Sequence, residues 1–124
     1  MVRQASVLLI ATLMAGAAFG QKSMQQVSDA KLKELKATYA SAKKKHTAKP
    51  KDAKAKKALV DASFALGMGS MYSESLSARV KYKEALVYFR ETLKLDPKHK
   101  MAAEQKKLIE DIYKSMGRPV PGGN

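Results

Sequence analysis

The side chains best suited to chemistry in this sequence are two histidines and one pair of carboxylates. His46 and His99 lie in lysine-rich turns (KKKHTAK and PKHK), and neither has a carboxylate or second histidine at a spacing that suggests a site. A metal ion or a general base needs such neighbours, so we expect both histidines in solvent-exposed loops. Glu110 and Asp111 are adjacent on an expected helix and point about 100° apart. We therefore predict no catalytic residue, no metal ligand, no cofactor and no enzyme activity.

Sulfur and aromatic side chains indicate packing instead of catalysis. The chain has no cysteine, which excludes disulfides, thiolate zinc sites and thiol catalysis. Four methionines recur at helical spacing and are typical of core positions: Met68, Met71, Met101 and Met116. We assign Tyr72 and Tyr82 to the core as well. Tyr113 is expected on the outer face of the last helix, where it could contact a ligand.

The dominant charge feature is a lysine-rich segment at residues 43–57. The chain carries 24 Lys and Arg against 11 Asp and Glu, a net charge of +13, and residues 21–57 hold twelve lysines against three acids, which is +9 of that total. Eight lysines form the candidate contact with a polyanion: Lys43, Lys44, Lys45, Lys49, Lys51, Lys54, Lys56 and Lys57. The segment lacks arginine and aromatic residues, which nucleic-acid recognition favours. Two interpretations stay open: a salt-sensitive contact with an acidic envelope polymer or anionic membrane, or a solvated helix end.

Residues 1–20 have the pattern of a secretory signal peptide. Arg3 supplies the positive start, residues 7–19 are uncharged and mostly apolar, and Ala18 and Gly20 are small residues at the cleavage positions. We predict cleavage after Gly20 and export to a bacterial periplasm or the medium, without a lipid anchor because no cysteine follows. A retained membrane anchor is the alternative, although a spanning helix needs about 20 apolar residues.

The remaining chain predicts an all-α fold of about four helices in antiparallel helix-turn-helix pairs. Apolar residues recur every three or four positions over 29–45, 52–72, 78–95 and 98–116, and no stretch alternates like a strand. The second helix is apolar around much of its circumference, so it must pack on more than one side. Its Gly67 and Gly69 lower helix propensity, which indicates close approach of a neighbour. We expect a flexible lead-in at 21–28, a helical domain at 29–117 and a flexible tail at 118–124.

Residues 64–97 resemble one tetratricopeptide repeat with a flanking helix on each side. The family's helix-crossing, aromatic and helix-ending positions have matches here, which we expect to be the repeat-packing residues: Gly69, Tyr72, Tyr82, Ala85, Phe89 and Pro97. Gly69 and Ala85 stand four residues further apart than in the family, and Thr92 replaces a small residue. The resemblance implies a fragment of an α-solenoid whose concave groove, lined by the first helix of each pair, binds partner peptides.

These features predict a non-enzymatic, exported helical module that binds a protein partner through a repeat-like surface. The alternative is a basic protein that binds envelope polyanions or an anionic membrane through residues 43–57. Two helix pairs are fewer than the three repeats that such folds usually need for stability, which leaves self-association open. Neither the partner nor the process follows from the residues.

Overall fold

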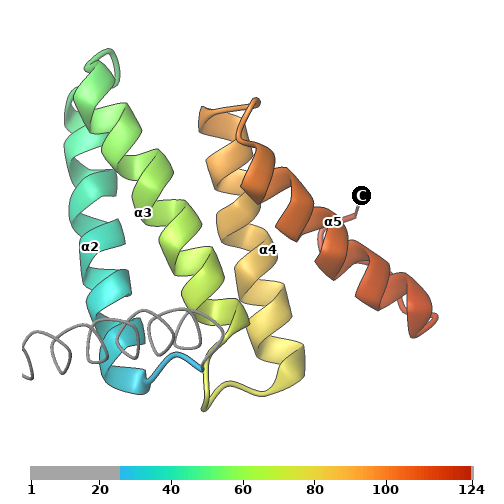
Figure 1. The fold of residues 1–124 in the computed structure, drawn as a ribbon. Helices are drawn as coiled ribbons and strands as arrows, with labels where there is room; N and C mark the ends of the chain where they lie inside the picture. The colour runs from blue at the N-terminus through green and yellow to red at the C-terminus, as the bar shows by residue number, and fades with distance from the viewer. Residues whose placement is uncertain (1–25, 124) are drawn as a thin grey trace, which may run out of the picture.

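The computed structural model describes residues 26–123, which form four helices and no strand beyond one isolated bridge. The helices are α2 (Asp29–Ala48), α3 (Ala53–Met71), α4 (Ala78–Leu95) and α5 (Lys100–Ser115) (Figure 1). The predicted all-α class and the four helical segments are confirmed, and α2 extends three residues beyond its predicted end. The predicted signal peptide lies outside the described residues. Within residues 26–123, every helix is too short or too polar to cross a membrane.

Side chains at the helix starts explain why the helices begin where they do. Ser28, Asp52 and Ser77 each accept a hydrogen bond from a backbone N–H of the first turn of α2, α3 and α4. His99 does the same for α5 through Nδ1, 3.1 Å from the Ala102 nitrogen. Such caps satisfy N–H groups that lack a partner inside the helix. Three of the four caps are short polar residues that sequence rules favour, whereas His99 is not.

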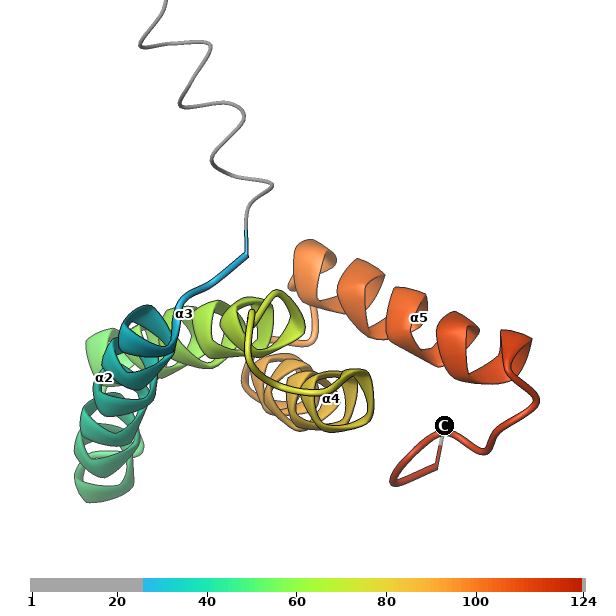
Figure 2. The same cartoon turned by 90° about the horizontal axis from the view of Figure 1, so that it is seen from below.

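Each helix packs against the next one along the chain, and α3 packs against two neighbours. The contacts join α2 to α3, α3 to α4, and α4 to α5. Consecutive helices run in opposite directions, and α5 diverges from α4 toward its C-terminal end (Figure 1). Seen from below, α4 lies offset between α3 and α5 (Figure 2). This arrangement confirms that α3, apolar around much of its circumference, is covered on more than one side.

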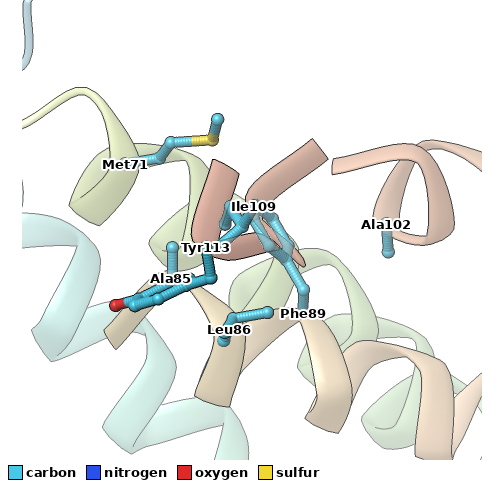
Figure 3. Close-up of a cluster of buried hydrophobic side chains, with 7 residues drawn as sticks. All are labelled: Met71, Ala85, Leu86, Phe89, Ala102, Ile109 and Tyr113. Atoms are coloured by element: carbon cyan, nitrogen blue, oxygen red, sulfur yellow. The ribbon is translucent and has the colours of Figure 1, made fainter. Parts of the chain in front are cut away.

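The larger apolar core lies where α4 meets α3 and α5. Seven buried side chains gather there (Figure 3): Met71, Ala85, Leu86, Phe89, Ala102, Ile109 and Tyr113. The Phe89 ring lies against the backbone of Gly67, where an added Cβ atom would stand 2.6 Å from Cε1. Gly67 therefore admits the ring at a distance that no other residue would allow. The predicted packing role of this glycine is confirmed.

A second, smaller core joins α2 to α3. Ala42, Leu59 and Ala62 are buried there, with Tyr39 and Leu95 packed around them. Further along, Gly69 meets Leu35, whose Cδ1 would lie 2.5 Å from an added Cβ atom. The two glycines of α3 thus face different partners, Gly67 toward α4 and Gly69 toward α2.

A pair of hydroxyl groups is buried between α3 and α4. Ser63 Oγ and Thr92 Oγ1 lie 2.7 Å apart, and both side chains are fully buried. The Val60 carbonyl lies 3.0 Å from Ser63 Oγ, and the Tyr88 carbonyl lies 2.9 Å from Thr92 Oγ1. Because each hydroxyl has one proton, one of the two donates to the other, which donates to its own carbonyl. Buried polar groups need such partners. Thr92 stands where the repeat family has a small residue. Its hydroxyl can be buried there because Ser63 faces it.

The other repeat-packing residues differ in their environments. Ala85 and Phe89 are fully buried, and Tyr82 is half-buried against the larger core. Pro97 is exposed just beyond the end of α4. Tyr72 is 38% exposed, so its assignment to the core was wrong. The helical periodicity stops applying there, because α3 ends at Met71 and Tyr72 leaves the helical path.

Both ends of the described chain are held against the helices. The Val27 N–H donates to the Tyr72 carbonyl at 2.7 Å, and the Glu74 N–H donates to the Val27 carbonyl at 3.0 Å. At the other end, residues 118–123 turn back from α5, and Val120 packs against the larger core. We call residues 118–123 the C-terminal strap. The segments expected to be a flexible lead-in and a flexible tail therefore make specific contacts at residues 26–28 and 118–123.

Candidate functional site

The lysine-rich segment is the tip of the α2–α3 hairpin, at the upper end of both helices in Figure 1. The turn is held by backbone bonds: Lys49 donates to the Lys45 carbonyl at 3.0 Å, and Asp52 donates to the Lys49 carbonyl at 3.1 Å. Asp52 then caps α3, accepting from the Lys54 N–H at 3.0 Å. Pro50 lies inside the turn, where its missing N–H breaks no helical bond. The lysines therefore extend from an ordered turn.

The lysines of the tip differ in whether they have an acidic partner. Lys43 lies 2.9 Å from Glu91 Oε2 and Lys57 lies 3.3 Å from Asp61 Oδ2. The other six form no ion pair with any residue of the described chain: Lys44, Lys45, Lys49, Lys51, Lys54 and Lys56. The candidate polyanion contact is therefore six unpaired cations, while Lys43 and Lys57 already have partners.

A shallow hollow of about 400 Å³ lies among these lysines. Lys45, Lys49 and Lys54 stand around it, and three alanines and Asp52 complete the lining. The alanines are Ala48, Ala55 and Ala58. Cations around a small apolar floor suit an anionic group that carries some apolar surface. Asp52 opposes an anion there, although its carboxylate is engaged as the cap of α3.

Lys43 belongs to a polar network that joins α2 to α4. Tyr39 donates to Glu91, and Lys43 Nζ lies 3.1 Å from the Tyr39 hydroxyl. Its hydrogen bond to Glu91 holds the pKa of Lys43 above its ordinary value. Burial raises the pKa of Tyr39, and the hydrogen bond to Glu91 raises it further. Tyr88 packs edge-on against Tyr39, with ring centroids 5.3 Å apart. This network holds two helices together, so Lys43 is a structural residue.

Neither histidine is the exposed loop residue that the sequence suggested. His46 lies in the last turn of α2 and is half-buried. His99 is half-buried, caps α5, and stacks on Phe64 with ring centroids 4.8 Å apart. The expectation was wrong because α2 continues past its lysine run, and because α5 needs a cap directly after Pro97. Both histidines thus have structural places.

Two predictions about the side chains of the last helix were wrong. Tyr113, expected on an outer face, is 8% exposed and lies in the larger core (Figure 3). Met101 and Met116, expected in the core, are 55% and 53% exposed, and Leu108 is 45% exposed. The sequence shows which residues share a face of α5 but not how far α4 covers that face. The outcome is an exposed set of large apolar side chains: Met101, Leu108 and Met116.

The carboxylates of α5 do not converge. Glu110 lies 2.9 Å from Lys106, and Asp111 lies 2.9 Å from Lys107. The hydrogen bond from Lys107 lowers the pKa of Asp111. Within residues 26–123, no three histidine or carboxylate side chains are grouped closely enough to hold a metal ion. Glu110 and Asp111 are therefore engaged in separate ion pairs, a half-buried one for Glu110 and an exposed one for Asp111.

Sequence reasoning missed the role of Arg90. Its guanidinium donates to backbone carbonyls of the C-terminal strap, with Nη1 2.7 Å from the Pro121 oxygen. The available signal was the Pro121-Gly122 pair, which is typical of a tight turn. A turn predicts a change of chain direction but not the side chain that will meet it. The contact between the turn and Arg90 depends on how α5, the helix before the turn, packs against α4, and the sequence does not show this.

Two surfaces follow as binding candidates from the residues that the sequence singled out. One is the six-lysine tip between α2 and α3, and the other is the exposed apolar set on α5. The buried residues between them belong to packing and caps. Comparisons with protein-family models, with curated proteins and with solved structures find no match to this chain.

Proposed function

We propose that this protein is an exported, non-enzymatic helical module of tetratricopeptide-repeat type that binds a protein partner. The observation that carries the proposal is the exposed apolar set formed by Met101 and Leu108 on the last described helix and Met116 directly after its end. Large apolar side chains that gather on a surface mark sites of interaction. A neighbouring face of α5, about 100° round the helix from Met101 and Leu108, is buried through Ala102, Ile109 and Tyr113. The helix therefore has apolar residues on its packed face and a further exposed apolar set that is available to contact a partner.

The spacing of this set supports a partner that lies along the helix. Met101 and Leu108 are seven residues apart, which places them on one face about 10 Å apart. In the repeat-like interpretation, α3 and α5 are the first helices of successive pairs, whose outer faces line the groove. A partner segment that offers two apolar side chains at this separation would cover both residues. The signal-peptide pattern of residues 1–20 supports an encounter outside the cytoplasm.

A capture experiment tests this proposal. Residues 21–124 serve as bait for crosslinking in an envelope extract, beside the double variant Met101→Ser, Leu108→Ser. The matched control is Ala103→Ser, Lys107→Ser, which changes two other exposed residues of α5. We expect the wild type and the control to retain one specific protein and the Met101/Leu108 variant to lose it. Recovery of the same proteins by all three baits would contradict the proposal.

We propose a second function, contact with anionic envelope polymers or membranes, on a separate observation. Six lysines at the tip of the α2–α3 hairpin have no ion pair within residues 26–123, and three of them, Lys45, Lys49 and Lys54, line an alanine-floored hollow there. Each lysine near an anionic membrane surface contributes about 1 kcal/mol to binding. Such binding weakens as salt screens the charges.

Vesicle binding with matched lysine variants tests the second function. Lys49→Gln, Lys54→Gln removes two cations from the tip, and Lys33→Gln, Lys36→Gln removes two from the opposite half of α2. We expect the tip variant to bind phosphatidylglycerol vesicles roughly thirtyfold more weakly than wild type, and the other variant to lose much less. Equal losses in the two variants, or affinity independent of salt, would remove the tip as the site.

A further inference from the structure

The C-terminal strap ends in a tight turn that Arg90 holds. The Gly123 N–H donates to the Val120 carbonyl at 3.0 Å, with Pro121 and Gly122 at the corner. Gly122 has φ +75°, as a type II turn with proline at its first corner requires. Arg90 donates from Nη1 to the Pro121 carbonyl and from Nη2 to the Gly123 carbonyl. An added Cβ atom on Gly122 would lie 2.5 Å from Arg90 Nη1, so the guanidinium is in close contact with this glycine.

The bonds that Arg90 makes are not the strongest available to it. A guanidinium forms two parallel hydrogen bonds with a carboxylate, and charge-assisted bonds are about twice as strong as neutral ones. In residues 26–123, Arg90 has no ion pair, and its two acceptors are neutral carbonyls. The part of the strap that Arg90 contacts, residues 121–123, thus carries no charged side chain, although a guanidinium is suited to a carboxylate.

Arg90 is one member of a basic row along α4. Five residues three or four positions apart share one face of the helix: Arg79, Lys83, Val87, Arg90 and Lys94. None of its four cations has an ion pair in the described part of the chain. Val87, in the middle, is 57% exposed. We call these five residues the α4 basic stripe.

A shallow hollow of about 370 Å³ lies along the first half of this stripe. It is lined by Arg79, Val80, Lys83, Glu84 and Val87. Besides its two cations, the hollow is lined by two valines and the carboxylate-bearing Glu84. A polypeptide offers apolar side chains for the valines together with carboxylates for the cations, whereas a phosphate group offers only anionic oxygens. The lining of the hollow therefore favours a polypeptide.

We propose that the α4 basic stripe binds an acidic, extended segment of a partner protein, and that the C-terminal strap occupies its Arg90 end when the partner is absent. The inference rests on the proposed partner-binding function and assigns it a second contact. From residue 79 to residue 94 the stripe is about 22 Å long, which an extended segment spans with about seven residues. Acidic residues toward both ends and apolar residues at the centre, opposite Val87, match its pattern. The +13 charge of the chain also attracts an acidic partner.

A fluorescence-anisotropy titration with purified protein tests the inference. The probe is a labelled eight-residue peptide with two glutamates at each end and valines in the middle, and its glutamine counterpart is the control probe. Arg90→Gln is compared with Arg118→Gln, which removes the same charge from the exposed start of the strap. We expect Arg90→Gln to weaken binding about tenfold and Arg118→Gln to weaken it much less. Circular dichroism verifies that each variant remains helical.

A strap variant tests the competition separately. Gly122→Ala places a Cβ atom at φ +75°, where L side chains are strained, and next to Arg90, so the turn should open and leave the guanidinium while the helices stay intact. We expect this variant to bind the glutamate peptide at least about threefold more tightly than wild type, because the competing state is depopulated. Unchanged affinity would overturn the role of the strap.

The remaining outcomes separate this inference from the general proposal. Equal weakening by Arg90→Gln and Arg118→Gln, or equal binding of the glutamine peptide, would overturn the stripe as a receptor. If Arg90→Gln lowers the affinity for phosphatidylglycerol vesicles as much as the affinity for the glutamate peptide, the proposed selectivity of the stripe for a peptide is overturned. Failure of the capture experiment on α5 leaves these titrations unchanged, since they use no extract.

Discussion

The two ends of α3 lie in opposite environments. Its first turn belongs to the lysine tip, where Lys54 and Lys56 are exposed and have no ion pair within residues 26–123. Its second half is enclosed between α2 and α4, where Leu66 is fully buried and Gly67 touches Phe89. One helix therefore carries unpaired charge at one end and much of the core at the other. The contrast separates the residues that stabilise the protein from those available for recognition.

This separation has a physical reason. Lysine charges repel one another, and burying one without a partner is costly. Apolar burial supplies the main favourable contribution to folding and requires close contact. A charged tip at one end of a long helical hairpin keeps the repelling groups in water while the other end packs. Substitutions in the two regions should therefore affect different measurements.

The largest effect is expected from Phe89→Ala in the buried region. Removal of a fully buried ring leaves a cavity at the contact of α4 with α3 and α5, which costs about 3–5 kcal/mol. Urea denaturation followed by circular dichroism measures the loss. Val87→Ala, on the exposed face of the same helix, is the control and should change stability little. A Phe89→Ala protein as stable as this control would show that the ring does not organise the core.

Gly67→Ala should destabilise the same region although alanine is the better helix former. The new methyl group would lie 2.6 Å from the Phe89 ring, and overpacking of this kind costs about 1–3 kcal/mol. Alanine recovers about 1 kcal/mol through helix propensity, so a net loss is expected. Thermal unfolding compares Gly67→Ala with the double variant Gly67→Ala, Phe89→Leu, in which the smaller side chain should restore part of the stability. An increase in the melting temperature of the single variant would refute the close contact.

Glu91→Gln tests the network at the boundary between the two regions. Tyr39 and Lys43 both have pKa values above their ordinary 10.0 and 10.5 in the folded state. Both groups hold protons more tightly when folded, so their contribution is present below about pH 10 and is lost as the pH rises through the raised values. Glu91→Gln should cost less than about 1 kcal/mol at pH 7, because Lys43 is largely exposed.

The stability of wild type and Glu91→Gln, measured from pH 8 to pH 11.5, distinguishes this network from general alkaline effects. We expect the difference between the two proteins to shrink above pH 10. A difference that stays constant over this range would mean that Tyr39 and Lys43 are not coupled to Glu91.

The smallest effect on stability is expected at the tip. Lys49→Gln, Lys54→Gln should change the free energy of unfolding by less than about 0.5 kcal/mol, even though it weakens vesicle binding. Urea denaturation at low and at high salt measures it. A marked stabilisation at low salt would show that repulsion among the lysines limits stability, and a marked loss would show that the tip lysines pack.

Several elements of the fold followed directly from local sequence rules. Asp52 and either Ser28 or Asp29 are of the types that favour helix starts, Pro50 and Pro97 are of the type that breaks helices, and Gly67 predicted a close neighbour. Each rule concerns a residue and its nearest chain neighbours, which is why it could be applied without knowledge of the fold. The lysines of the tip were identified in the same way, from composition alone.

Other residues could not be assigned from the sequence. Tyr72 and Met101 were expected in the core and are exposed, whereas Tyr113 was expected on an outer face and is buried. Periodicity defines the faces of a helix, but burial depends on which neighbouring helix covers each face and where that helix ends. Lys43 was grouped with the tip because nothing local to it indicates Glu91, 48 residues away.

The sequence by itself determined the all-α class, the number and approximate extent of the helices within residues 26–123, and the position of the charge, because periodicity, caps and prolines act within a few residues. The tertiary structure alone decided which cations are paired, which apolar residues of α5 stay exposed and where the C-terminal strap lies. These features depend on distances between segments far apart in the chain. Arg90 illustrates the difference: its charge is evident in the sequence, but the carbonyl groups that it holds are 31 and 33 residues away.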